Sequence, residues 1–326
     1  MTTLKDVARE AGLTVSTVSR VLNNRGYISE DARRRVQDAV KKLNYHPNEA
    51  ARLLQNKRSN TIGVIVPNIR HPYFSKMIHA LESHAYERGY KILLCNSQNI
   101  EAREKEYLEV CSMNRVAGII LLSGTVAVED LLGTDMPVVT LERYLDSGIA
   151  SVECDNLGGG EMAAQCLIDN GCRHLAIIGT SRNQTPMPAD MRSEGFRRIC
   201  LDKGIPCEEA FTNHNDFKQL EYRDLIRRLL TEHPDIDGIL TSGDVIAAQC
   251  LQVCAELGIN VPGELKLISF DDTQLLQWLV PPVTAVRQPV QEMAQLAVSF
   301  LDDAVNSKVV PERTLLPVQL IMRETV

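Results

Sequence analysis

The sequence contains no long hydrophobic run and no hydrophobic leader. Its longest apolar stretches are about six residues long, as in 117–122, whereas a helix needs roughly 20 apolar residues to span a bilayer. Met1 is followed directly by the mostly polar residues 2–6 instead of a basic and then apolar segment, which argues against a secretory signal. We therefore expect a soluble, cytoplasmic protein with no membrane partner.

Cysteine is present, but in no metal-binding pattern. The nine cysteines are scattered without a C-x-x-C pair, so neither a disulfide framework nor a structural metal is expected. The enzyme signatures G-x-G-x-x-G, G-x-x-x-x-G-K-[ST], G-x-S-x-G and H-E-x-x-H are also missing. The run Gly158-Gly159-Gly160 lacks dinucleotide spacing, and we interpret it as close packing where two lobes meet. The chain is predicted to be no enzyme and to need no cofactor.

Charge is distributed unevenly along the chain. The net charge of the 326 residues is −7, yet residues 1–60 contain 12 Lys and Arg against 6 Asp and Glu, a local charge of +6. The remaining 23 basic and 36 acidic residues give −13. A basic end on an acidic body indicates a polyanion-binding module attached to a second unit that need not contact the polyanion.

The basic end has the pattern of a helix-turn-helix unit. Apolar residues at helical spacing, with Thr3 and Ser29 as caps and Gly12 as a stop, predict the helices 4–11, 15–22 and 30–43. The second helix of such a unit enters the DNA major groove, which places at the base edges Val15, Ser16, Thr17 and Arg20. The plausible phosphate contacts are Thr3, Thr14, Ser19, Asn23 and Arg33. A three-helix bundle with a solvated charged face fits the same pattern.

Beyond residue 60, short β-branched runs alternate with amphipathic helices. The expected strands are 61–66, 91–95, 117–122, 137–141, 150–154, 174–178, 237–241, 266–270 and a final stretch near 314–323. The expected helices lie near 73–88, 101–114, 157–170, 188–203, 217–232, 244–257 and 289–306. This alternation predicts an α/β fold with doubly wound parallel sheets. About nine strands favour two sheets over one.

Particular residues in the first 50 positions resemble the lactose/galactose repressor (LacI/GalR) family of bacterial transcription regulators. The matching segments are Leu4-Lys5-Asp6-Val7-Ala8, Ala11-Gly12, Thr17-Val18-Ser19-Arg20-Val21-Leu22-Asn23 and Asn44-Tyr45-His46-Pro47-Asn48. The resemblance implies a helix-turn-helix domain (1–46), a hinge helix and linker (47–59), and a periplasmic-binding-protein-like effector and dimerisation domain (60–326). That last domain is expected to have an N-lobe (about 60–157 and 288–313) and a C-lobe (about 158–287 and 314–326).

The segment 48–56 looks helical but is too short to be stable alone. In the family it is a hinge whose leucine wedges into the minor groove, which implies DNA contacts by Asn48, Ala51 and Leu54. The alternative is a plain linker with one buried leucine.

Polar residues at the carboxyl ends of the predicted strands indicate a ligand site, because open α/β sheets bind ligands there. The resemblance implies a small-molecule effector, a sugar or sugar derivative, and the effector-binding residues Tyr73, Phe74, Asn99, Glu142, Arg192, Phe217, Asp244 and Asp271. Asp244 fits a helix cap equally well. The role of His71 stays open, and Trp278 either lines the site or packs in the core.

Three classes of protein are consistent with this sequence pattern. They are an effector-controlled transcription regulator, a periplasmic solute-binding protein and an enzyme on a doubly wound fold. The basic N-terminal unit and the missing leader favour the regulator, most simply a repressor that binds operator DNA as a homodimer. The sequence has no leucine-heptad tail of the kind that makes tetramers. The identity of the effector, its sign of action and the target genes are left open.

Overall fold

The computed structural model describes residues 2–22, 28–45, 59–179, 187–212 and 219–326. The chain divides into two compact units, Met1–Ser59 and Asn60–Val326, which are described separately below. Within the described residues, no helix is long and apolar enough to cross a membrane.

The described part of the first unit forms a three-helix bundle. Its helices are α1 (Leu4–Ala11), α2 (Val15–Leu22) and α3 (Glu30–Lys42). Thr3 caps α1 in a reciprocal capping box with Asp6, and Gly12 ends the helix with a φ of 62°, in the left-handed region where glycine is preferred. The small core that holds the helices together consists of Val7, Ala8, Ala11, Val18, Val21, Val36, Ala39 and Tyr45. The predicted helices are confirmed to within a residue.

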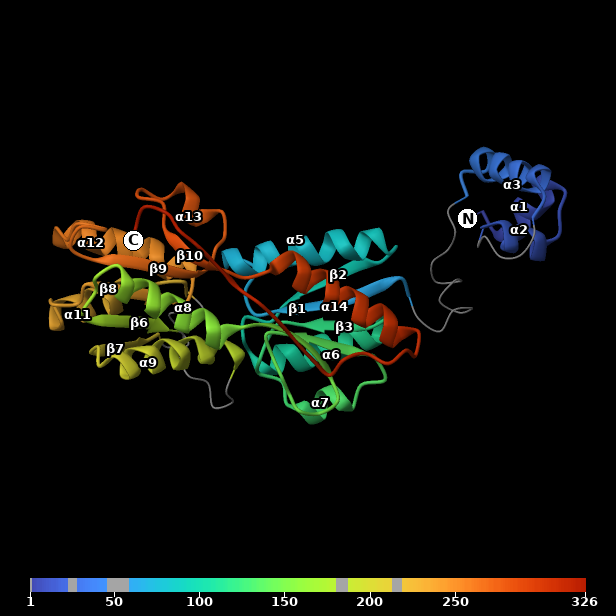
Figure 1. Ribbon diagram of the computed structural model, residues 1–326. Coiled ribbons are helices and arrows are strands. Elements are labelled where there is room, and N and C mark those ends of the chain that lie inside the picture. The colour runs from blue at the N-terminus through green and yellow to red at the C-terminus, as the bar shows by residue number, and fades with distance from the viewer. Residues whose placement is uncertain (1, 23–27, 46–58, 180–186, 213–218) are drawn as a thin grey trace. The chain divides into compact units, whose positions relative to one another are not determined.

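The second unit contains two six-stranded sheets, each the centre of one lobe (Figure 1). The N-lobe sheet has the order β11-β5-β4-β3-β1-β2 and is parallel throughout. Its strands are β1 (Thr61–Val66), β2 (Lys91–Asn96), β3 (Ile119–Leu121), β4 (Val138–Leu141), β5 (Ala150–Cys154) and β11 (Arg313–Leu316). The inner strands β1, β3, β4 and β5 are almost wholly buried, as strands covered on both faces are, whereas the edge strands β2 and β11 are partly exposed.

The C-lobe sheet has the order β12-β10-β9-β8-β6-β7, in which only the edge strand β12 is antiparallel among the described pairings. Its strands are β6 (Leu175–Gly179), β7 (Cys207–Phe211), β8 (Gly238–Thr241), β9 (Lys266–Asp271), β10 (Thr284–Arg287) and β12 (Gln319–Ile321). The two-sheet, doubly wound architecture is therefore confirmed.

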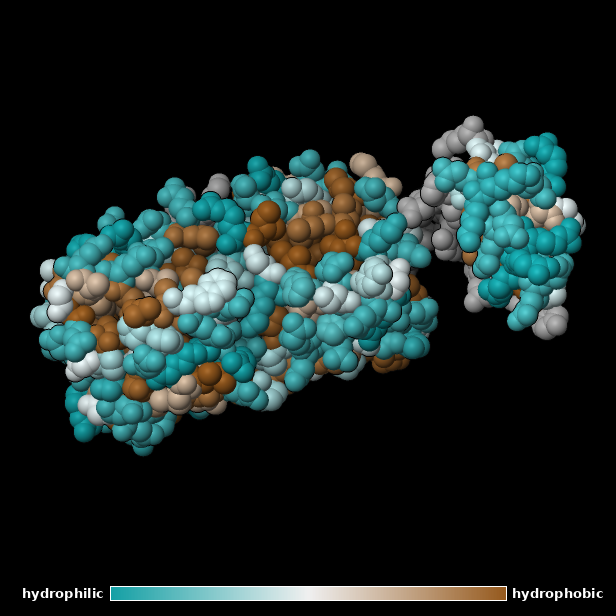
Figure 2. Space-filling view, turned by 90° about the horizontal axis from the view of Figure 1, so that it is seen from above, coloured by the Kyte–Doolittle hydropathy of each residue, from teal (hydrophilic) through white to brown (hydrophobic). Residues whose placement is uncertain are grey.

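Helices cover both sheets. The N-lobe helices are α5 (Pro72–Glu87), α6 (Glu101–Met113), α7 (Val128–Leu132) and α14 (Val290–Val305). The C-lobe helices are α8 (Asn156–Asp169), the 3₁₀ helix η1 (Pro188–Asp190), α9 (Met191–Lys203), α11 (Arg223–Glu232), α12 (Asp244–Leu257) and α13 (Leu275–Trp278). Helices α5 and α14 lie side by side on one face of the N-lobe (Figure 1). Hydrophobic side chains gather on the surface over these two helices (Figure 2).

The chain passes between the lobes three times, after β5, after β10 and after β11. The last strand pattern, expected as one stretch near 314–323, is two strands in different sheets. Residues 313–316 pair with β5, whereas residues 319–321 pair with β10. Pro317 lies between them and cannot donate to a ladder. The final crossover therefore follows Leu316, slightly later than the boundary near 313 that the sequence indicated.

The glycine run in α8 allows an unusually close helix contact, but not where the sequence suggested. A Cβ on Gly160 would lie 2.1 Å from the carbonyl oxygen of Arg192, and one on Gly195 would lie 2.1 Å from that of Leu157. The close packing is thus between α8 and α9 inside the C-lobe, not at the junction of the lobes. It brings the start of α9 against the start of α8.

Candidate DNA surface and effector site

The start of α2 presents polar side chains to solvent. The Thr14 hydroxyl accepts a hydrogen bond from the Thr17 backbone N–H at 3.2 Å and meets the Ser16 hydroxyl at 2.8 Å. Thr14 therefore caps α2, as N-terminal threonines commonly do. Val15 is 40% exposed although it is apolar. Its exposed methyl groups and the adjacent Ser16 form the surface expected to contact base edges.

The opposite face of α2 is buried, so its polarity is one-sided. Val18 and Val21 pack into the core, while Arg20 is exposed. Several basic groups of this unit are engaged in ion pairs within it: Arg9–Asp6, Arg34–Asp31, Arg35–Asp31 and Lys42–Glu10. Arg20 forms no ion pair within the described part of the chain, and it is the basic side chain on the predicted recognition helix.

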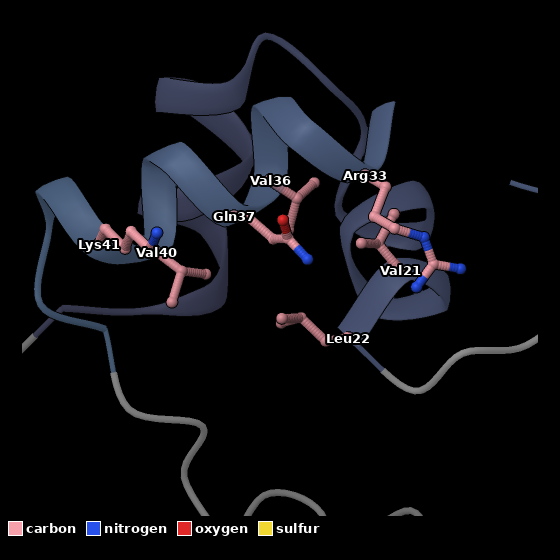
Figure 3. A pocket seen from close by; sticks show the side chains of 7 residues that line it. All are labelled: Val21, Leu22, Arg33, Val36, Gln37, Val40 and Lys41. Atoms are coloured by element: carbon pink, nitrogen blue, oxygen red, sulfur yellow. The ribbon is translucent and has the colours of Figure 1, made fainter. Parts of the chain in front are cut away.

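A shallow groove lies between α2 and α3 (Figure 3). Its lining consists of Val21, Leu22, Arg33, Val36, Gln37, Val40 and Lys41. Val21, Leu22, Val36 and Val40 make part of this lining apolar, while Arg33, Gln37 and Lys41 supply polar groups. Arg33, one of the predicted phosphate contacts, is exposed here.

Five predicted site residues lie outside the residues that the structure describes. They are Asn23, Asn48, Ala51, Leu54 and Phe217. Their assignment rests on the sequence alone.

In the C-lobe, Arg192 is the centre of a buried polar cluster. Its guanidinium carbon lies 3.8 Å from the centroid of the Phe270 ring. Its Nε donates to Asn156 Oδ1 at 2.7 Å, and its Nη1 donates to the Ser242 carbonyl at 2.7 Å. The same Nη1 lies 3.3 Å from Asp271 Oδ1. The side chains of Arg192 and Asp271 are only 8% and 4% exposed, so water screens their attraction little.

Asp271 ends β9 in a strained backbone. Its φ is 97° and that of Asp272 is 54°, a region that non-glycine residues adopt at a cost of roughly 1–3 kcal/mol each. Gln288, at the crossover between lobes, donates from Nε2 to Asp271 Oδ1 at 2.6 Å. Strain of this kind is concentrated at ligand sites.

Tyr73, in the N-lobe, lies close to the buried charges of Arg192 and Asp271. Tyr73 is 6% exposed, and burial raises the pKa of its phenol well above the usual value, helped by the nearby carboxylates of Glu142 and Asp271. Its ring meets Phe74 edge-on at 5.3 Å between centroids. The structure thus places Tyr73, Glu142, Arg192 and Asp271 in one electrostatic neighbourhood, although they come from different lobes.

Both carboxylate oxygens of Glu142 accept hydrogen bonds from the protein itself. Its two carboxylate oxygens accept from the Cys154 backbone N–H and the Asn156 side-chain amide, both at 2.7 Å. Burial raises the pKa of the Glu142 carboxyl, partly offset by Arg192. In this arrangement Glu142 orients Asn156, which in turn accepts from Arg192.

Asp244 is also engaged by the protein. One oxygen accepts from the Ser269 hydroxyl at 2.8 Å and the other from the Thr273 backbone N–H at 2.6 Å. Burial, followed by the nearby Asp271 carboxylate, raises the pKa of Asp244 to about 7. Asp244 is the first residue of α12, whose N-cap is Gly243, so the capping alternative for Asp244 is wrong.

His71 caps α5 and faces the C-lobe. Its Nδ1 accepts from the Tyr73 backbone N–H at 3.3 Å, so the neutral ring carries its hydrogen on Nε2. Burial lowers the pKa of His71, and Asp271 acts in the opposite direction. The ring lies 3.9 Å from the position that a Cβ on Gly243 would take. His71 therefore belongs to the same cluster.

Two residues of the cluster, Ser242 and Gln288, were not among the site residues predicted from the sequence. The side-chain atoms Ser242 Oγ, Gln288 Oε1 and Tyr73 Oη are buried and have no hydrogen-bond partner within the described residues. Three atoms on the N-lobe loops are also buried without a partner in the described part of the chain: Arg143 Nε and the hydroxyl oxygens of Ser123 and Thr125. Buried polar groups are rarely left unpaired. Position at a strand end was the only sequence signal for them.

The remaining predicted residues have local roles in this structure. Asn99 adopts a φ of 55° on the loop after β2, and its backbone N–H donates to the Ser97 hydroxyl at 3.2 Å. Trp278 is 69% exposed at the end of α13, so the core-packing alternative for it is wrong. Within the described residues, no three His, Cys, Asp or Glu side chains are arranged to hold a metal ion.

Comparison with known proteins covers both units. The family model "Bacterial regulatory proteins, lacI family" matches residues 3–48, and a periplasmic binding protein-like domain model matches residues 164–326. The chain is 34% identical over 326 residues to a ribose operon repressor of Halalkalibacterium halodurans, covering 100% of this chain and 97% of the relative. It is 35% identical over 323 residues to a sucrose operon repressor of Streptococcus mutans, covering 99% of each.

A solved structure resembles the second unit. A periplasmic binding protein/LacI transcriptional regulator from Alkaliphilus metalliredigens QYMF, complexed with D-xylulofuranose, has a TM-score of 0.74 and 29% identity. The match covers 82% of this chain and 99% of that one. Full-length likeness to operon repressors excludes the solute-binding and enzyme alternatives. The chain belongs to the lacI family of bacterial regulatory proteins and is a DNA-binding transcription regulator, not an enzyme.

Proposed function

We propose that this protein is a repressor that binds operator DNA as a homodimer. In this proposal a sugar or sugar derivative, bound between the N-lobe and the C-lobe, controls its affinity for DNA. The relatives named above repress ribose and sucrose operons, and the solved neighbour carries a ketopentose. We place the protein in the cytoplasm, where its operator would be.

The unpaired buried polar atoms around Arg192 carry the effector part of the proposal. Tyr73 Oη, Ser242 Oγ and Gln288 Oε1 are buried and have no partner among the residues that the structure describes, and they lie beside a charged pair that is itself buried. A sugar hydroxyl both donates and accepts, so adjacent hydroxyls can satisfy all three atoms and also reach Asp271. The aromatic rings of Tyr73 and Phe74 are suited to cover an apolar sugar face.

We divide the predicted effector residues into two groups. Tyr73, Phe74, Arg192 and Asp271 would contact the effector. Asn99 and Phe217 stay predicted contacts, and Phe217 lies outside the described residues. Glu142 and Asp244 have both oxygens occupied within the protein, so their proposed role is to hold the contacting groups in place. Rigid support of this kind is what binding sites need to be precise.

The DNA part of the proposal rests on α2 and on charge. Base edges would be read by Val15, Ser16, Thr17 and Arg20, with phosphate contacts from Thr3, Thr14, Ser19, Asn23 and Arg33. In the hinge segment, Asn48 and Ala51 would approach the minor groove while Leu54 wedges between bases. Two copies would match two half-sites, and binding would weaken steeply with salt because counterions are released.

One face of the N-lobe is suited to bind a second copy of this chain. Hydrophobic side chains gather over α5 and α14 (Figure 2), and the partly buried apolar residues of these helices include Ile78, Leu296 and Phe300. Contiguous exposed apolar surface commonly marks a protein interface. We propose that this face forms much of the dimer contact.

A thermal-shift screen tests the effector part. D-ribose, sucrose, other pentoses and hexoses, and sugar phosphates are added to the full-length protein, and a binding sugar raises the melting temperature by mass action. Asp271→Asn should abolish the shift. Asp303→Asn, the same change at a carboxylate paired with Lys308 on the surface, should leave it intact. No shift with any sugar, or an undiminished shift in Asp271→Asn, would contradict the proposal.

A further inference from the structure

Helix α5 of the N-lobe reaches the C-lobe through Lys76. The half-buried Lys76 donates from Nζ to the carbonyl oxygen of Asp272 at 2.8 Å, across 196 positions of sequence. This bond joins the lobes at a place other than the three crossovers of the chain. Hydrogen bonds with an ionised donor are roughly twice as strong as neutral ones.

The acceptor belongs to a peptide group that is held at both ends. The Asp272 carbonyl and the Thr273 N–H are parts of the same planar peptide unit. Lys76 holds its oxygen from the N-lobe, and Asp244 Oδ2 accepts from its N–H at 2.6 Å in the C-lobe. Rotation of this peptide would break both bonds.

The side chain of Asp272 is held as well. One carboxylate oxygen accepts from Arg287 Nε at 2.6 Å and the other from Arg323 Nη2 at 2.5 Å. The backbone of Asp271 and Asp272, with φ values of 97° and 54°, persists only when its surroundings fix it. Within this set of contacts, Lys76 is the one that comes from the other lobe.

We propose that Lys76 is a positioning residue that holds the strained Asp271–Thr273 turn and ties it to α5. In this role it sets the direction of the Asp271 carboxylate without contacting the effector itself. Any movement of Asp271 on effector binding stretches or relieves the Lys76 bond, and α5 carries the proposed dimer face. The part concerning effector rests on the function proposed above, whereas the mechanical part rests on the ligand-free contacts alone.

Hydrogen exchange of the full-length protein tests the mechanical part without any effector. Lys76→Met keeps the apolar stem and removes the donor, so the amides of 271–275 should exchange about tenfold faster than in the unsubstituted protein. Lys76→Arg restores a donor and should restore protection. Lys105→Met removes a lysine that pairs on the surface with Glu101 and Asp130, and it should leave 271–275 unchanged.

Equal exchange of 271–275 in Lys76→Met and the unsubstituted protein would overturn the proposal. So would faster exchange confined to α5, which a purely local role in that helix predicts. D-ribose and sucrose then serve as probes: whichever the unsubstituted protein binds should bind Lys76→Met about tenfold more weakly. If it binds neither, the failure concerns the proposed effector class, and the exchange result still decides the role of Lys76.

Discussion

Removing the Tyr73 hydroxyl should stabilise the protein while it weakens effector binding. The phenol is 6% exposed and its oxygen has no partner within the described residues. An unpaired buried polar group costs about 1–3 kcal/mol. Tyr73→Phe removes that group with little change of shape. Its free energy of unfolding should therefore rise by about 1–3 kcal/mol, which is about 2–4 °C in Tm per kcal/mol for a domain of this size.

A matched substitution, Tyr90→Phe, should lower the free energy of unfolding instead of raising it. Tyr90 lies in the same lobe, and its hydroxyl donates to Asp302 Oδ1 at 2.7 Å. Tyr90→Phe loses that bond and should destabilise the protein by about 1 kcal/mol, with no change in effector affinity. Urea unfolding followed by circular dichroism measures both variants, and calorimetry with a binding sugar measures affinity.

The pair of variants separates a ligand contact from a structural one. If the Tyr73 oxygen forms its hydrogen bond only with a bound sugar hydroxyl, Tyr73→Phe should gain stability and bind the sugar about tenfold more weakly. A loss of stability in Tyr73→Phe comparable with that in Tyr90→Phe would refute the reasoning, because the oxygen would then have a structural partner.

Two further substitutions follow from the assignments. Asp244 has a pKa of about 7 when folded, above its ordinary value of 3.8, so the folded state binds the extra proton between these values and loses stability as pH rises toward 7. Asp244→Asn removes this loss: its stability relative to the unsubstituted protein should rise from pH 4 to pH 7 and level off above, and a flat difference across that window would contradict the shift. Leu54→Ala should weaken operator binding and reduce DNA bending while effector affinity stays the same, as gel shift and calorimetry can determine; unchanged bending would remove Leu54 from the wedge position.

The sequence predicts regular elements well where periodicity is strong. The helices of the first unit and strands such as 61–66 and 150–154 stand out because their apolar residues follow one pattern over a whole element. Strand β7 (Cys207–Phe211) was missed because two glutamates interrupt it, and β10 (Thr284–Arg287) because it is short and follows two prolines.

The site could be predicted only in part. Arg192 and Asp271 follow from resemblance to a family, and the structure brings them to 3.3 Å. Which polar atoms are left unpaired depends on packing across two lobes, which no local pattern encodes. The bond from Lys76 to Asp272 likewise joins residues 196 positions apart, and nothing in either neighbourhood predicts it.

In the proposed function, effector and operator bind one protein at coupled sites. The most direct test is to measure the affinity for a binding sugar with and without operator, beside the affinity for operator with and without that sugar. Coupling through the protein requires the two ratios to be equal. We predict equal factors of at least about fivefold. Identical sugar affinities with and without operator, beside a sugar-dependent shift in operator binding, would contradict the account.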